Sequence, residues 1–293
     1  MPSSSAPDSV GVWPKPPAFL TAEVMARDLW RSLKPKPPGV DAYFISFPKC
    51  GRTWLELMIG MSLMRASGHP IESARRDLYA LANEYNLSLR VHACHDWSET
   101  TLEAREAVNP QFLFASDLRM KYWGKVVFML VRDPRDTIVS SYYQVTTRAF
   151  RPLPFNSIDE YVLDPVYGIN RIIQFYRIWD RNAKHTTFAF ERYESLRANT
   201  EHVLRRIISF LGVPEAENMR LDDIIEACSF DRFRKLEQSG REDMRQFGGT
   251  SMSMKARKGS IGGYREELRP ETVAILDSVM SAMPPRFGFS VSD

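Results

Sequence analysis

Three short segments of the sequence combine basic residues with glycine, proline or hydroxyl residues, a combination that suits anion binding. The first segment, Pro48-Lys49-Cys50-Gly51-Arg52-Thr53-Trp54, follows the apolar run Ala42–Phe47. A turn from a strand into a helix leaves the first amides of the helix unpaired at the positive end of its dipole, which favours a phosphate. Gly51 lets the backbone approach closely, Lys49 adds a charge and Thr53 adds a hydroxyl donor. We therefore expect an anion here, although the spacing of a Walker A loop is absent.

The second segment, Arg132-Asp133-Pro134-Arg135-Asp136, follows another apolar run and is itself followed by Ser140. Side chains lean toward the N-terminus of their helix, so the Ser140 hydroxyl is expected to point back toward Arg132. A guanidinium and a hydroxyl can hold a second phosphate, and each charge-assisted hydrogen bond contributes ~1.5–3 kcal/mol. Taken alone, a capped helix start with surface ion pairs explains the segment equally well.

The third segment reads Arg257-Lys258-Gly259-Ser260-Ile261-Gly262-Gly263-Tyr264-Arg265 and ends a glycine-rich, basic stretch that begins at Gly240. Two adjacent cations before flexible glycines can close over an anion. Taken alone, the segment fits a solvated basic loop, just as the first segment fits an ordinary strand-to-helix turn.

Alternating apolar runs and amphipathic stretches indicate the elements that carry these segments. Short apolar runs predict strands at Ala42–Phe47, Val126–Val131 and Thr186–Phe190. Helical periodicity and end signals predict helices at Thr53–Met64, Thr137–Gln144, Ile172–Arg181 and Thr200–Leu211. Alternation of this kind predicts an α/β fold with a central, mostly parallel sheet flanked by helices. We expect residues 1–40 to form an arm with a short helix (Thr21–Leu33) and residues 41–293 to form a single domain.

Composition limits what the whole chain can do. The 293 residues carry 39 Lys and Arg against 36 Asp and Glu, a net charge of +3. This balance argues against a protein that coats nucleic acid or an anionic membrane, so any basic site must be local. The three cysteines are widely spaced and form no CxxC pair, which indicates neither a disulfide framework nor a zinc module. Without an apolar stretch of about 18 residues or a signal sequence, we expect a cytoplasmic protein.

In order and spacing, the three segments resemble the soluble sulfotransferases that use 3′-phosphoadenosine 5′-phosphosulfate (PAPS) and release adenosine 3′,5′-bisphosphate (PAP). The likeness extends from about Tyr43 to Arg265. Members of that family carry P-K-[ST]-G-T-T-W, and this chain reads P-K-C-G-R-T-W. Their R-[ND]-P-[KR]-D with a later serine matches Arg132 to Ser140, and their R-K-G-x-x-G-D-W-K appears as R-K-G-S-I-G-G-Y-R. The resemblance implies the sulfotransferase fold, with its P-loop-like sheet, and sulfuryl transfer from PAPS.

The resemblance also implies roles for individual residues. Lys49 would act in catalysis and hold the 5′-phosphosulfate with the backbone of Gly51, Arg52, Thr53 and Trp54. The 3′-phosphate would be bound by Arg132, Ser140, Arg257, Lys258 and Gly259. Tyr193 would lie near the adenine, as would Ser229 and Phe230, with Trp54 and Phe230 stacking on the base. No metal is expected.

A histidine is the natural general base because its ordinary pKa of about 6.5 lies near cytosolic pH. The chain has five: His69, His92, His95, His185 and His202. The family's base segment reads [KR]-[TS]-H at the end of the strand after the first helix, which favours His95, followed here by Asp96. Ala93 stands where that segment carries a lysine. His92 remains an alternative base.

Two other functions remain open at this level. A P-loop kinase shares the strand-to-helix phosphate cradle but needs Mg²⁺, for which Asp133 is the available carboxylate. A non-catalytic nucleotide-binding protein would explain Ala93 and the other departures as lost chemistry. For a sulfotransferase, we expect a small-molecule acceptor reached past residues 64–90 and 145–168, with aromatic residues such as Tyr79, Tyr143 and Tyr161 nearby. Its identity, O- against N-sulfation, and the choice between monomer and homodimer are not specified by the sequence.

Overall fold

A parallel sheet forms the centre of the protein. The computed structural model describes residues 37–96, 98, 119–148, 153–165, 167–229, 231–232, 235 and 259–289, and the predicted helix Thr21–Leu33 lies outside them. The strands are β1 (Ala42–Ser46), β2 (Val91–Cys94), β3 (Val126–Val131) and β4 (Thr187–Arg192), in the order β2-β1-β3-β4. All three strand pairs are parallel. The predicted α/β class with a mostly parallel sheet is therefore confirmed.

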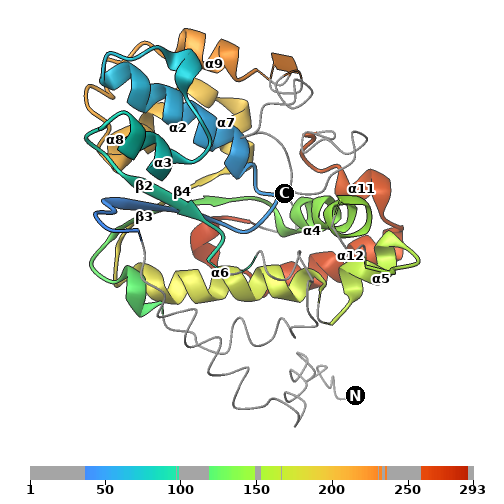
Figure 1. The fold of residues 1–293 in the computed structure, drawn as a ribbon. Helices are drawn as coiled ribbons and strands as arrows, with labels where there is room; N and C mark the ends of the chain where they lie inside the picture. Colours follow the sequence, from blue (N-terminus) through green and yellow to red (C-terminus); the bar gives the residue numbers. More distant parts are fainter. Residues whose placement is uncertain are drawn as a thin grey trace, which may run out of the picture. The chain divides into compact units, whose positions relative to one another are not determined.

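Helices cover both faces of this sheet (Figure 1). One layer contains α2 (Arg52–Ala66), η1 (Ile71–Ser73), α3 (Leu78–Glu84), α7 (Tyr193–Ala198), α8 (Thr200–Leu211) and α9 (Asp222–Ala227). The other contains α4 (Pro134–Tyr143), α5 (Ile158–Leu163), α6 (Ile169–Ala183), α11 (Tyr264–Glu267), α12 (Pro270–Met280) and η6 (Pro285–Phe287). The short helices η4 (Met120–Tyr122) and η5 (Gln144–Arg148) join elements. Each layer packs its own apolar cluster against the sheet, so the core has two halves.

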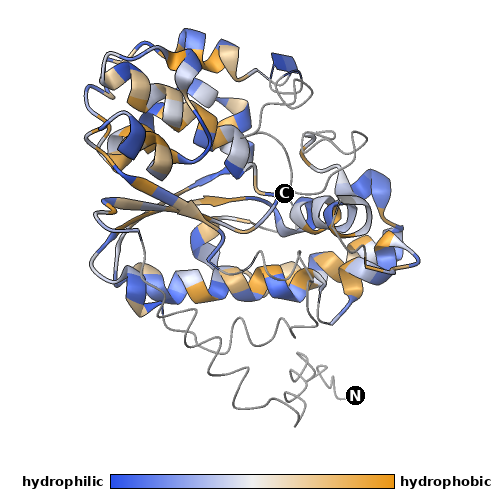
Figure 2. Ribbon diagram, in the orientation of Figure 1, coloured by the Kyte–Doolittle hydropathy of each residue, from blue (hydrophilic) through white to orange (hydrophobic). Residues whose placement is uncertain are grey.

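Local signals in the sequence explain why these helices form where they do. Every residue of α2 from Leu55 to Met64 is buried, as its largely apolar sequence predicts, whereas α6 has an apolar and a polar side (Figure 2). Pro134 is the first residue of α4, with the Asp133 side chain as its cap. Helix α8 has the predicted bounds and ends at Gly212 with a φ of 82°. The three predicted strands and the predicted helices Thr53–Met64, Thr137–Gln144 and Ile172–Arg181 are confirmed, with ends shifted by a few residues.

The parallel arrangement determines which residues can meet. The carboxyl ends of parallel strands lie at one edge of the sheet, where open α/β folds bind ligands. The residues that follow the four strands, Phe47, His95, Arg132 and Tyr193, therefore project from the same edge. Among the helices in the described ranges, none is long and apolar enough to cross a bilayer.

Candidate functional site

The turn between β1 and α2 has the backbone shape of an anion cradle. Lys49 and Gly51 both have positive φ, 75° and 92°. The amides of Trp54 and Leu55 bond to the Gly51 carbonyl, so the amides of residues 51–53 precede the hydrogen-bond ladder of the helix. A Cβ on Gly51 would lie 2.7 Å from the ring of Tyr193. Glycine is thus required here both for the backbone angle and for space.

Arg132 connects the three basic segments. Its Nη1 donates to the Lys49 carbonyl at 3.1 Å and its Nη2 donates to the Ser260 carbonyl at 3.1 Å. Its guanidinium carbon also lies 4.7 Å from the centre of the Tyr193 ring. The segments after β1 and β3 and the segment beginning at Gly259, which are far apart in sequence, therefore converge at one place.

Asp136 strengthens the link between α4 and the third segment. Its carboxylate accepts hydrogen bonds from the amides of Gly262 (2.8 Å) and Tyr264 (3.2 Å). Burial raises the pKa of Asp136, and Arg132 and the Gly262 amide oppose this. Sequence reasoning missed this role. Its only signal was an acidic residue four positions after Arg132, the spacing that places both on one side of a helix.

Of the other residues predicted to bind the donor, some are described by the structure and some are not. Lys49 Nζ donates to Gln144 Oε1 at 3.3 Å, and Ser140 is partly buried on α4. Tyr193 OH donates to the Gly259 carbonyl at 3.5 Å, and Thr53 is partly buried in the cradle. Phe230, Arg257 and Lys258 lie outside the described residues.

Trp54 joins the cradle to the segment that follows α9. Its Nε1 donates to the Cys228 carbonyl at 2.7 Å, which brings Ser229 to the same part of the molecule. The rings of Trp54 and Tyr193 meet edge to face with centres 6.3 Å apart. Arg197 lies over the Trp54 ring at 5.7 Å. Aromatic surfaces therefore adjoin the anion cradle, as an adenine nucleotide requires.

His95 lies directly after β2 and is held by β1. Its Nδ1 is 2.8 Å from the Ser46 carbonyl, which only accepts, so Nδ1 carries the proton and Nε2 is left as a base. Burial lowers the pKa of His95 well below its ordinary value, and the charges of Arg52, Lys49 and Arg76 lower it further. The hydrogen bond to Ser46 opposes these effects. The imidazole is consequently neutral at physiological pH.

Asp96 has a structural role. Its buried carboxylate pairs with Arg119 and with Lys121 (2.9 Å) and accepts a hydrogen bond from Tyr122 OH (3.0 Å). Burial raises its pKa, but the two cations outweigh this and the net pKa is lowered. The hydrogen bond of the His95 imidazole goes to the Ser46 carbonyl and not to Asp96.

A cluster of charges adjoins His95 on the α2 side. Arg52 Nε lies 3.2 Å from Glu56 Oε1, one helical turn on, and the other oxygen of Glu56 lies 3.6 Å from Arg76 Nε. Glu56 is 4% exposed. Sequence reasoning did not assign Glu56 or Arg76, although Glu56 is the one acidic residue in an otherwise apolar stretch of helix.

His92 lies on β2 beside Tyr43 of β1, three residues before His95. At ~3.3 Å per residue, this puts it about 10 Å from the carboxyl edge of the sheet. Its ring meets those of Tyr43 and Tyr79 edge to face, with centres 6.1 and 6.5 Å apart. This position favours His95 over His92 as the residue facing the cradle.

Two of the aromatic residues expected near the acceptor have other partners. Tyr161 is fully buried and its OH pairs with Ser141 at 2.8 Å, so it belongs to the core. Tyr143 OH donates to Glu267 at 2.6 Å.

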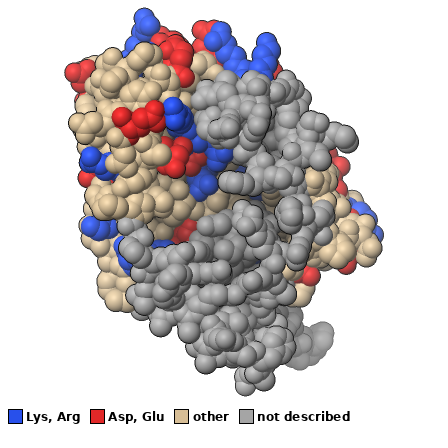
Figure 3. All heavy atoms as spheres, in the orientation of Figure 1, with Lys and Arg blue, Asp and Glu red and all other residues tan. Residues whose placement is uncertain are grey.

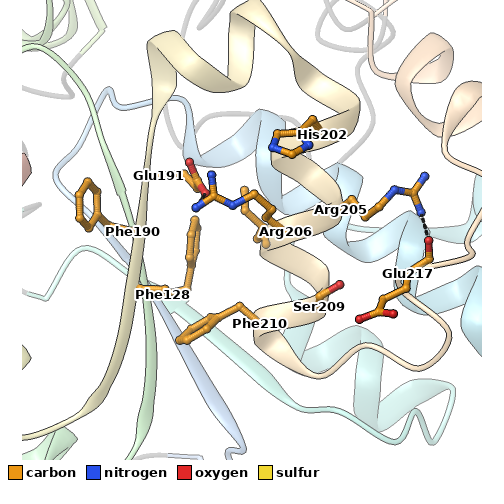
Figure 4. Close-up of a pocket in the computed structure, with 11 residues that line it drawn as sticks. Phe128, Phe190, Glu191, His202, Arg205, Arg206, Ser209, Phe210 and Glu217 are labelled. Atoms are coloured by element: carbon orange, nitrogen blue, oxygen red, sulfur yellow. Dashed lines mark hydrogen bonds and ion pairs between the residues drawn. The ribbon is translucent and has the colours of Figure 1, made fainter. Parts of the chain in front are cut away.

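The described residues also form a surface of mixed charge and a cavity away from the cradle residues. Basic and acidic side chains are interspersed on the face shown in Figure 3, in keeping with the small net charge. A cavity of about 460 Å³ lies between β4 and α8, with Phe128 and Phe210 below and the Glu191–Arg206 ion pair (3.1 Å) above (Figure 4). Phe190 contributes backbone only, since its side chain packs on the opposite face of the sheet. None of the residues predicted to bind the donor lines this cavity.

Metal ligands are also lacking within the described part of the chain, where no group of three His, Cys, Asp or Glu side chains could hold an ion. Asp133, the carboxylate that a kinase would need, is 5% exposed and caps α4. Both of its oxygens accept hydrogen bonds from the Arg135 side chain, whose guanidinium also donates to Asp277 at 2.7 Å.

Comparison with known proteins agrees with this geometry. The family model described as "Sulfotransferase domain" matches residues 40–286. Cytosolic sulfotransferase 5 of Arabidopsis thaliana is 24% identical over 280 residues, covering 84% of this chain and 80% of that protein. Cytosolic sulfotransferase 13 of the same plant is 25% identical over 250 residues, covering 78% and 72%.

Solved structures show the same fold. A mouse sulfotransferase complexed with PAP superimposes with a TM-score of 0.54 at 18% identity, covering 84% of this chain and 85% of the other. Retinol dehydratase in complex with androsterone and PAP superimposes with a TM-score of 0.55 at 15% identity, covering 87% and 84%. With the family model spanning most of its length, this chain belongs to the sulfotransferase domain family.

Proposed function

We propose that this protein transfers a sulfuryl group from PAPS to a hydroxyl or amine of a small-molecule acceptor, with His95 as the general base. Sulfuryl transfer is the chemistry of the family to which the chain belongs. The observation that carries the specific proposal is the convergence of the segments at Lys49, Arg132 and Gly259 next to a neutral histidine.

The residues present fit PAPS, which supplies the sulfuryl group when bound. The backbone amides of Gly51, Arg52 and Thr53, together with the Lys49 ammonium, suit the 5′-phosphosulfate. Arg132 and Ser140 suit the 3′-phosphate, with Arg257, Lys258 and Gly259 from the third segment. Trp54 and Tyr193 offer aromatic surface for adenine, and Ser229 and Phe230 follow the Cys228 carbonyl to which Trp54 bonds.

His95 would take the proton of the acceptor at Nε2 as the acceptor oxygen attacks sulfur. The new bond joins that oxygen to sulfur, and the bond from sulfur to the bridging phosphate oxygen breaks with its electron pair on PAP. Lys49 and the cradle amides would stabilise the charge that grows on the bridging oxygen. Because such transfers have loose transition states, positioning and electrostatics supply most of the rate.

The test is a mass-spectrometric screen for an 80 Da gain across phenol, alcohol, amine and sugar acceptors with PAPS. Calorimetry with PAP runs in parallel. The wild type should bind PAP and sulfate at least one acceptor, whereas His95→Ala should bind PAP with unchanged affinity and lose turnover. PAP binding without any sulfation would favour a non-catalytic nucleotide-binding protein. Binding of ATP-Mg²⁺ but not of PAP in the calorimetry would favour a kinase.

We also propose that residues 41–293 form the single catalytic domain, preceded by an arm at residues 1–40. The family match at residues 40–286 supports this boundary. Relatives named as cytosolic sulfotransferases support a cytoplasmic location, and the net charge of +3 supports a small-molecule acceptor in preference to nucleic acid or membrane.

A further inference from the structure

A cation is missing from β2 at the position where the sulfotransferase base segment carries lysine or arginine. Ala93 pairs in register with Phe44 of β1 and packs on the α2 face of the sheet. A lysine at position 93 would lie on that face, one residue before the carboxyl end of β2, because alternate residues of a strand share one face. The structure therefore indicates where the missing charge would lie.

Arg52 brings a cation to the same face from the first turn of α2. Arg52 is the first residue of α2 and follows Ser46 by six residues, and the Ser46 carbonyl lies 2.8 Å from His95 Nδ1. The Arg52 side chain is 16% exposed, so solvent screens it weakly. An arginine at this point of the helix therefore adjoins both the anion cradle and the base.

Glu56 holds Arg52 in this position. The pair is separated by 3.2 Å and four residues of helix, and Glu56 is itself buried. One carboxylate oxygen faces Arg52 and the other faces Arg76. A single buried carboxylate shared between two guanidinium groups fixes their orientation without neutralising both.

We propose that Arg52 is a further catalytic residue that contacts an oxygen of the transferred sulfuryl group and replaces the cation missing at Ala93. This inference rests on the proposed sulfuryl transfer. As the bond from sulfur to the bridging oxygen breaks and the bond to the acceptor oxygen forms, Arg52 stabilises the sulfuryl oxygens on the side of His95. Lys49 stabilises the leaving phosphate on the other side. The proton passes from the acceptor to Nε2 of His95.

The test removes the cation at position 52 and then adds one at position 93. Turnover is measured as PAP release from PAPS with 2-naphthol as acceptor, and PAP affinity is measured by calorimetry. Arg52→Thr should lower kcat by about 100-fold, the size expected for one donor to a developing charge, and leave the Kd of PAP within about 3-fold. Adding Ala93→Lys to Arg52→Thr should restore kcat by at least about 10-fold.

Arg65→Thr is the matched control. Arg65 lies on the same helix and pairs with Asp223, away from the cradle, so its loss should leave kcat unchanged. Thermal unfolding of every variant shows whether it is folded. A kcat for Arg52→Thr within about 3-fold of wild type, or no recovery in the folded double variant, overturns the proposal for Arg52. If the wild type neither binds PAP nor releases it from PAPS, sulfuryl transfer itself is wrong, a result distinct from either of these.

Discussion

The two ends of the candidate site are built differently. At the donor end, side chains bond to backbone atoms: Arg132 to two carbonyls, Asp136 to two amides and Trp54 to a carbonyl. At the base end, charged side chains bond mainly to one another, as in the groups around Glu56 and Asp96.

This difference explains which departures from the family pattern each end tolerates. Contacts to backbone atoms depend on the path of the chain and not on the neighbouring side chain. Cys50 and Gly263 can therefore replace the usual residues without loss of the bonds around them. Side-chain charges must instead change together, so the absence of a cation at Ala93 and the presence of one at Arg52 belong to a single arrangement.

Removal of the Lys49 ammonium should have the largest effect. Lys49→Ala is expected to lower kcat by about 10³-fold, because this charge faces the leaving phosphate as it becomes more negative. The Kd of PAP should rise much less, since the cradle amides remain. Steady-state kinetics with PAPS and calorimetry with PAP measure the two effects. Equal losses in kcat and affinity would contradict the division between catalysis and binding.

Arg132→Ala should act mainly on donor affinity. Charge-assisted hydrogen bonds contribute ~1.5–3 kcal/mol each, so the Kd of PAP should rise by about 10- to 150-fold. The variant also loses the bonds to the Lys49 and Ser260 carbonyls, which adds to the loss of affinity. At saturating PAPS, kcat should fall by less than in Lys49→Ala. An unchanged Kd would show that the 3′-phosphate binds elsewhere.

Gly51→Ala tests whether the backbone path matters at the donor end. Both the positive φ and the approach of the Tyr193 ring oppose a methyl group here. Gly68 is the matched control, since its φ is 72° but no atom lies within 4 Å of the added Cβ. Gly68→Ala should lower the free energy of unfolding by ~1 kcal/mol and Gly51→Ala by ~2–4 kcal/mol. Only Gly51→Ala should also weaken PAP binding. An equal loss of unfolding free energy in the two variants would show that Tyr193 moves aside freely.

The sequence predicted the donor end better than the base end for a physical reason. Apolar runs such as Val126–Val131 and helix-end residues such as Pro134 and Gly212 act locally, so short stretches of sequence predicted the strands and helices. The shared partners of Arg132 follow from parallel strands ending at one edge. The pairing of Asp96 with Arg119, and of Glu56 with Arg76, depends on packing between elements that no local pattern encodes.

The pH dependence of kcat/KM gives the smallest and most specific test of the base end. Because burial and the charges of Arg52, Lys49 and Arg76 lower the pKa of His95, the imidazole stays neutral as pH falls past about 6.5, the ordinary value. The acid limb of kcat/KM, which reports the free enzyme, should therefore lie below pH 6.5.

Arg76→Met removes one of the cations that lower the pKa of His95, so this pKa should rise and the acid limb should move back toward pH 6.5. Arg75→Met, whose exposed partner is Glu84, should leave the limb in place. A limb that does not respond to Arg76→Met would mean that the titrating base is not beside this cluster, and would return the assignment to His92.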